Sequence, residues 1–230
     1  MSPRAVPGAS QAEGAASAFA RRDPYWPAQV TVLAAILLNL DLPSRLTLQP
    51  GWVLPALEGV LLAGLVASTP WEGERARPWR RRVALLLIGI VSAANLLSLG
   101  LLCHYLLHHA STTGGRTLIR AGVEIWITNV LLFAVWYWEL DRGGPQARKR
   151  TDCPPPDWLF PQMTEERLGR WNWRAAYPDY LYLSFTNATA FSPTDAMPLS
   201  HMAKMLMLVQ SLASLVTIGL VVARAVNILS

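Results

Sequence analysis

The stretch RVALLLIGIVSAANLLSLGLLCHYLLH, from Arg82 to His108, decides the fold. Between Arg82 and His104 it carries no ionisable side chain except the Cys103 thiol, and it exceeds the roughly 20 helical residues that cross the hydrocarbon core of a bilayer. The whole composition agrees, because 52% of the 230 residues are hydrophobic and only 15% are charged, against roughly 25% charged in a soluble domain. The sequence therefore predicts an integral membrane protein.

Four further apolar segments surround this stretch: residues 27–42, 52–68, 117–140 and 203–229. The first is short for a span, and a Pro/Gly-rich turn separates it from the second, so we expect these two to form a tight helical hairpin. Tryptophans fall near the ends of the segments, where indole rings favour the membrane interface. We therefore expect an all-α integral membrane helical bundle with about five transmembrane helices.

The chain divides into four regions. Residues 1–25 are rich in Ala, Ser, Gly and Pro and are expected to be a disordered tail. Residues 26–140 form a four-helix transmembrane region, and residues 141–176 form a polar loop. Residues 177–230 contain the segment YPDYLYLSF and the last span. That segment is too short to cross a bilayer but long enough for a re-entrant or interfacial helix.

The cations of the sequence are distributed unevenly about such a bundle. Sixteen of the 20 Lys and Arg lie on one side and four on the other. Because Lys and Arg are enriched on the cytoplasmic side, we expect a multi-pass protein of the cell inner (plasma) membrane with a cytoplasmic N-terminus. The cations sit beside apolar segments and form no exposed basic face, which argues against nucleic acid. The lipid bilayer is the expected partner.

Among the ionisable residues inside the predicted spans, three are the best candidates for a function, namely Glu58, Glu124 and Arg224. At 1.5 Å per residue all three lie roughly 7 to 11 Å below the same membrane surface. We therefore expect Arg224 to pair with one or both carboxylates. Two interpretations are open: an ion or proton site, or an interhelical ion pair that orders the bundle.

The last span also carries polar residues on one helix face. Gln210, Ser214 and Thr217 share this face with Arg224, because residues three and four apart lie above one another on a helix. Such a stripe fits either a watery path or hydrogen-bonded helix packing.

The sequence offers little for catalysis or metal binding. His104 and His108 stand one turn apart, but two ligands are half a site, and Cys103 lies on a different azimuth from His108, so no metal site is predicted. The two cysteines indicate neither a disulfide framework nor a zinc site. HExxH, GxSxG, P-loop and Rossmann glycine motifs are missing. We therefore expect neither an enzyme nor a cofactor.

The segment from Tyr177 onward resembles known membrane proteins. A short aromatic helix, a Thr-rich turn, an Asp three residues before a Pro and a long apolar helix follow one another, an order similar to the pore region of two-helix potassium channels. Residues 117–230 resemble an uncharacterised bacterial family of multi-pass integral membrane proteins of unknown function. The shared landmarks are VWYWELDRGGP (135–145), Pro-Asp-Tyr (178–180), Phe-Thr (185–186) and Thr-Asp (194–195).

The resemblance implies a re-entrant hairpin with a pore-like turn. Its polar residues would be Ser184, Thr186, Thr189, Ser192, Thr194 and Asp195. The turn departs from the channel pattern because residues 190–194 contain no glycine, which a ladder of backbone carbonyls requires. The channel arrangement also places the 141–202 loop outside the cell, opposite to the orientation that the cation count predicts.

Two function classes follow. In the first class the protein is ion-channel-like or transports a small ion or solute. In the second class it is a non-conducting membrane scaffold or accessory subunit. One hairpin per chain cannot ring a pore, so conduction by the channel plan requires a homo-oligomer, a homotetramer.

Overall fold

The computed structural model describes residues 24–43, 46, 53–67, 78–108, 115–164, 173–189 and 195–229. Within these ranges the chain forms six α-helices, short 3₁₀ turns and one pair of two-residue strands. The predicted all-α class is confirmed. The predicted tail lies outside the described residues except for its last two positions.

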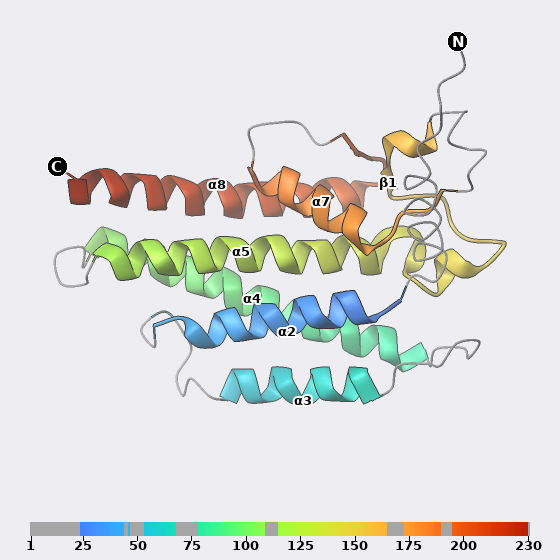
Figure 1. Ribbon diagram of the computed structural model, residues 1–230, viewed down its shortest axis with the longest axis horizontal. Coiled ribbons are helices and arrows are strands. Elements are labelled where there is room, and N and C mark those ends of the chain that lie inside the picture. Colours follow the sequence, from blue (N-terminus) through green and yellow to red (C-terminus); the bar gives the residue numbers. More distant parts are fainter. Residues whose placement is uncertain are drawn as a thin grey trace, which may run out of the picture.

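All five predicted apolar segments form helices. Their directions alternate along the bundle (Figure 1), so that α2, α4 and α8 run opposite to α3 and α5. Helix α4 begins four residues earlier than the expected span, at a proline, which the first helical turn tolerates because its N–H needs no partner there. The long helices are α2 (Trp26–Asp41), α3 (Val53–Ala67), α4 (Pro78–His108), α5 (Gly115–Leu140) and α8 (His201–Leu229).

Three of the described helices are long and apolar enough to cross a membrane. The apolar segments are Trp79–Leu106, Arg116–Gly143 and His201–Val226. Helices α2 and α3 have 16 and 15 residues and are only about 24 and 23 Å long at 1.5 Å per residue, short of the ~30 Å hydrocarbon core. Length and composition therefore support three spans directly.

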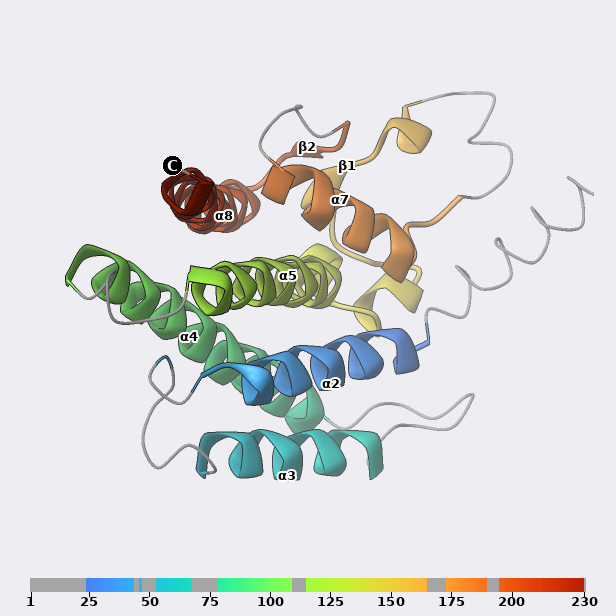
Figure 2. The ribbon, with the colours of Figure 1, turned by 60° about the vertical axis from the view of Figure 1, so that its left-hand side comes forward.

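Helix α5 is the centre of the bundle. It packs against α2, α4, α7 and α8, and 67% of its most apolar window is buried, against 22% for α8. Helix α3 lies on the side of α2 and α4 that is away from α5 (Figure 2). The outward surface of α8 is apolar, with exposed residues such as Leu208, Leu212 and Leu215, as expected for a helix that faces lipid.

Helix α7 (Tyr177–Thr189) enters the bundle from one end and stops halfway. Its first residue packs on the end of α5, where the Tyr177 and Trp138 ring centroids are 6.1 Å apart. Its last turn reaches the middle of α5, where the Trp126 indole N–H donates to the carbonyl oxygen of Ala188 (3.5 Å). The chain then returns to the same end, where β2 (Met197–Pro198) pairs with β1 (Trp158–Leu159). The expected short helix is therefore present, between the polar connection and α8.

The connection expected to be a polar loop, 141–176, is anchored to the core by Asp141. This side chain is fully buried and accepts hydrogen bonds from the Asp157 N–H (2.8 Å) and the Tyr180 hydroxyl (2.6 Å). The Arg148 guanidinium donates to the Asp141 carbonyl oxygen (3.0 Å). Gly144 has φ 97°, which glycine adopts without steric cost, so the chain reverses directly after α5.

Candidate functional site

Two apolar clusters fill the bundle, and polar side chains lie between them. The first apolar cluster includes Ile36 on α2 and Val91 on α4. The second includes Leu42, directly after α2, and Leu99 on α4. The polar side chains between the clusters form what we call the mid-bundle layer. Its members are Asn39 on α2, Glu58 on α3, Asn95 on α4, Thr128 and Asn129 on α5, and Gln210 on α8.

The half of this layer between α5, α7 and α8 is fully hydrogen-bonded around Gln210. Its amide nitrogen donates to the carbonyl oxygen (2.9 Å) and the hydroxyl (2.7 Å) of Ser184. Its amide oxygen accepts from the Tyr137 hydroxyl (2.5 Å) and the Asn187 amide (2.8 Å). Because a glutamine amide has two donor hydrogens and two acceptor sites, this side chain has no capacity left for a ligand.

The polar stripe predicted on the last span faces the same interface of α5, α7 and α8, which we call the seam. The Asn129 amide donates to the Ser214 hydroxyl (2.9 Å) and to the Gln210 carbonyl oxygen (3.3 Å). Thr217 donates back to the carbonyl oxygen of Ala213 (2.7 Å) on its own helix. Gln210, Ser214 and Thr217 are all buried. Of the two interpretations of the stripe, these contacts fit hydrogen-bonded helix packing.

The other half of the layer, on α2, α3 and α4, contains polar atoms without partners among the described residues. They are both carboxylate oxygens of Glu58, both amide atoms of Asn39 and the amide oxygen of Asn95. The Asn95 amide nitrogen itself donates to the carbonyl oxygen of Ile125 on α5 (3.3 Å). Glu58 is only 1% exposed and Asn95 only 3%. Burying an ionised carboxylate without a countercharge costs several kcal/mol, so Glu58 requires a proton or a cation. Within the mid-bundle layer, this is the half whose polar atoms lack partners among the described residues.

The expected pairing of Arg224 with the two intramembrane carboxylates is not formed as a hydrogen bond. Glu124 pairs instead with Arg120, one turn earlier on α5, where Nε and Oε1 are 2.7 Å apart. Arg120 also pairs with Asp41 at the end of α2. The four-residue spacing of Arg120 and Glu124, typical of ion pairs along a helix, was the sequence signal for this partner. Arg120 is therefore a partner of Glu124 that the prediction did not name.

The pore-like hydroxyls on α7 are bonded to backbone oxygens. Ser184 is fully buried and donates to the Val130 carbonyl oxygen on α5 (2.7 Å). Thr186 donates to the carbonyl oxygen of Tyr182 (2.9 Å), and Thr189 donates to that of Thr186 (2.9 Å). These bonds hold α7 together and attach it to α5.

The remaining pore-like positions lie at or beyond the end of α7. Ser192 and Thr194 are outside the described residues, whereas Asp195 lines an open cleft of about 420 Å³ at the end of the bundle. The pKa of Asp179 in this cleft is raised above its ordinary value by burial. The hydrogen bond that its carboxylate accepts from the Ala176 N–H opposes this effect but is the smaller of the two. The polar residues lining the cleft are Gln162, Asp179, Tyr182, Thr186 and Asp195.

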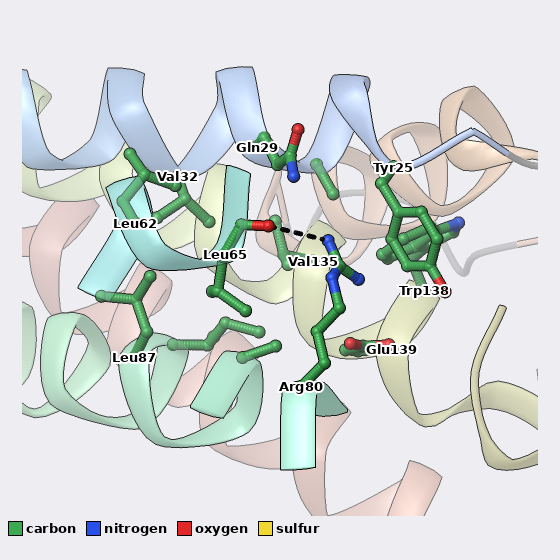
Figure 3. Close-up of a pocket in the computed structure, with 13 residues that line it drawn as sticks. Tyr25, Gln29, Val32, Leu62, Leu65, Arg80, Leu87, Val135, Trp138 and Glu139 are labelled. Atoms are coloured by element: carbon green, nitrogen blue, oxygen red, sulfur yellow. Dashed lines mark hydrogen bonds between the residues drawn. The ribbon is translucent and has the colours of Figure 1, made fainter. Parts of the chain in front are cut away.

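A second pocket, of about 380 Å³, lies between α2, α3, α4 and α5 near the cation-rich end. Figure 3 shows Arg80 reaching across it, with the Glu139 carboxylate beside the arginine side chain. Arg80 donates to the Leu65 carbonyl oxygen (3.3 Å) and lies over the Tyr25 ring, 4.0 Å from its centroid. Arg80 is one of the sixteen cations that the sequence places on one side of the bundle, and it is only 4% exposed. It ties the ends of three helices together.

His104 and His108, which were considered for metal binding, lie in the last turns of α4. Among the residues that the structure describes, no group of three or more His, Cys, Asp or Glu could hold a metal ion. Cys103 and Cys153 are both free thiols.

Comparisons with known proteins found no relative. No family model, curated protein or solved structure matches the chain. The resemblance of residues 117–230 to the channel-like bacterial family therefore stays a prediction.

Proposed function

We propose that the chain is a multi-pass membrane protein that transports a small ion or solute. The observation that carries this proposal is the mid-bundle layer, where Glu58 and Asn95 are buried with polar atoms that have no partners among the described residues. Polar and ionisable groups inside a membrane are expensive and usually mark substrate or ion pathways. A bundle that needed only stability would have apolar residues at these positions.

The proposed topology has five spans, α2, α3, α4, α5 and α8, with α7 as a re-entrant helix. The alternating directions of the five helices support this topology. The short helices α2 and α3 can be accommodated by local thinning of the bilayer or by polar residues at their ends that reach the interface. The exposed Asp41–Arg120 pair at the end of α2 is such a feature.

The re-entrant helix supports a transport function. Non-helical backbone at membrane depth is tolerated only where protein or a water-filled cavity covers it, and interrupted helices of this kind line the sites of channels and transporters. The end of α7 is held by side chains of its neighbours: Trp126 donates to the Ala188 carbonyl oxygen, and Ser211 donates to that of Asn187 (3.4 Å).

A non-conducting scaffold or accessory subunit is the second candidate. The observation that favours it is the seam of α5, α7 and α8, which is closed by its own hydrogen bonds around Gln210 and Asn129. A channel built from this hairpin would then need a homotetramer with its path between the chains.

Ion flux from proteoliposomes tests the proposal. We expect the wild-type chain to release Na⁺, K⁺ or H⁺ faster than protein-free vesicles, and the Glu58→Gln variant to lose at least ~10-fold of that rate, because the variant cannot carry a charge inside the membrane. The Asp195→Ala variant tests the contribution of the α7 cleft in the same assay.

The control for this experiment is Leu208→Ala, a change on the exposed face of α8, which is expected to leave flux unchanged. Wild-type vesicles that hold folded protein but release none of the three ions would contradict transport of these ions and favour the scaffold. The native mass in mild detergent shows whether a homotetramer is present.

A further inference from the structure

The half of the mid-bundle layer on α2, α3 and α4 has the composition of a cation site. Glu58 contributes two carboxylate oxygens, and Asn39 and Asn95 each contribute an amide oxygen, none with a hydrogen-bond partner among the described residues. Glu58 and Asn95 are more than nine-tenths buried. We propose that these three side chains bind an alkali-metal cation, which competes with a proton for the Glu58 carboxylate. This inference rests on the proposed function only for its place in the membrane.

The register of the helices brings the three side chains to neighbouring levels. Helix α3 packs on both α2 and α4, and Val32, Leu62 and Leu87 line one pocket. We count from these three residues toward the second cluster at a rise of 1.5 Å per residue. Glu58 then lies about 6 Å beyond Leu62 along α3. Asn39 lies about 10 Å beyond Val32 along α2, and Asn95 lies about 12 Å beyond Leu87 along α4. The three levels therefore differ by about one helical turn.

The donor set selects the class of ligand. Carboxylate and amide oxygens suit hard cations, whereas transition metals favour imidazole or thiolate ligands. The site carries one negative charge, so a monovalent cation or a proton neutralises it, whereas a divalent cation would leave a buried positive charge. An alkali-metal ion and a proton are then alternatives at the same carboxylate.

Other ionisable groups on the helices around α3 do not complete this site. On α2, Asp41 pairs with Arg120, and on α5 Glu124 also pairs with Arg120. The ionisable groups of α4 lie toward its two ends, three or more turns from Asn95 on the cationic side; they are Arg80, Arg81, Arg82, Cys103, His104, Tyr105 and His108. Glu58 is therefore the titrating group of the site.

Carbodiimide labelling tests the proposal on the full-length protein in detergent or vesicles. A hydrophobic carbodiimide modifies protonated carboxyl groups in apolar surroundings, and mass spectrometry identifies the modified residue. We expect Glu58 to be modified in choline chloride and to be protected by NaCl at equal ionic strength, with more Na⁺ required as the pH falls. LiCl and KCl arms identify the preferred ion. Glu124, which is paired with Arg120, is the internal control.

Variants separate a cation site from a carboxyl group that is merely protonated. In Asn39→Ala and Asn95→Ala we expect Glu58 to remain reactive, with protection requiring at least ~10-fold more Na⁺. Glu58→Gln should abolish the modification while its size-exclusion profile matches the parent. If folded protein is modified at one rate in Na⁺, Li⁺, K⁺ and choline, or is not modified at low pH, the cation site is wrong.

The two proposals fail separately. Protection by a cation without ion flux would leave a cation site in a protein that does not transport. Ion flux without protection would leave transport by another route and remove this site.

Discussion

Gln210 shows at the scale of one residue why the interior of this bundle is polar on one side. Its four side-chain hydrogen bonds join α8 to Ser184 and Asn187 on α7 and to Tyr137 on α5. A buried polar group that loses its partner costs roughly 1 to 3 kcal/mol, so these four residues depend on one another. The seam is consequently a structural unit, whether or not it also lies beside the proposed ion pathway.

The Gln210→Leu substitution should therefore be strongly destabilising. Leucine leaves the Tyr137 hydroxyl, the Asn187 amide and the Ser184 oxygens with fewer partners, and we expect the free energy of unfolding to fall by about 2 to 4 kcal/mol. Unfolding in detergent, followed by circular dichroism, measures the change. Leu208→Ala, at a side chain that is 59% exposed, should change it by only about 0.5 kcal/mol or less. Equal stabilities of the two variants would show that the seam contributes little.

At the scale of whole helices, a close approach of α5 to α8 depends on Gly122. A Cβ atom added at this position would overlap the Val221 side chain of α8. Overpacking a close contact forces side chains or backbone to shift and costs about 1 to 3 kcal/mol. The small residue therefore sets the spacing of α5 and α8 at this level, a common use of glycine between membrane helices.

A double-mutant cycle measures this contact. We expect Gly122→Ala alone to lower the free energy of unfolding by about 1 to 3 kcal/mol. The Gly122→Ala/Val221→Ala double variant should be at least about 1 kcal/mol more stable than the sum of the two single changes, because the second change removes the overlapping atoms. Strict additivity in detergent unfolding would mean that α5 and α8 are farther apart than the structure places them.

At the scale of the molecule, the two ends of the bundle differ in charge. The structure places the anchored 141–164 segment, the start of α4 and the start of α8 at one end, and the start of α5 at the other (Figure 1). The first end carries most of the described cations, which predicts that it is cytoplasmic. The channel resemblance predicts the opposite orientation.

Cysteine labelling decides between these orientations. In a background with Cys103→Ser and Cys153→Ser, we expect the Arg116→Cys variant to react with a membrane-impermeant maleimide in intact cells. The Asp152→Cys variant, at the opposite end, should react only after permeabilisation, because lipid separates it from the reagent. The reverse pattern would support the channel orientation, and reaction of both positions in intact cells would rule out an odd number of spans between them.

Several elements could be predicted from the sequence because the signals are local. Long apolar runs produce helices wherever they occur, so α2, α3, α4, α5 and α8 lie within a few residues of the expected segments. The aromatic segment before the last span produces α7 in the same way. The partner of Glu124 was missed, although Arg120 stands four residues before it, because the prediction considered contacts between helices ahead of those within one helix.

The sequence by itself determined the helical class, the membrane character and the polar residues inside the apolar segments, because hydropathy and helical periodicity depend on neighbours along the chain. Only the tertiary structure decided which polar residues meet. It closed the seam around Gln210 and left Glu58, Asn39 and Asn95 with unmatched atoms. Pairing depends on the register and rotation of helices that are far apart in sequence, and those follow from the packing of all the side chains together.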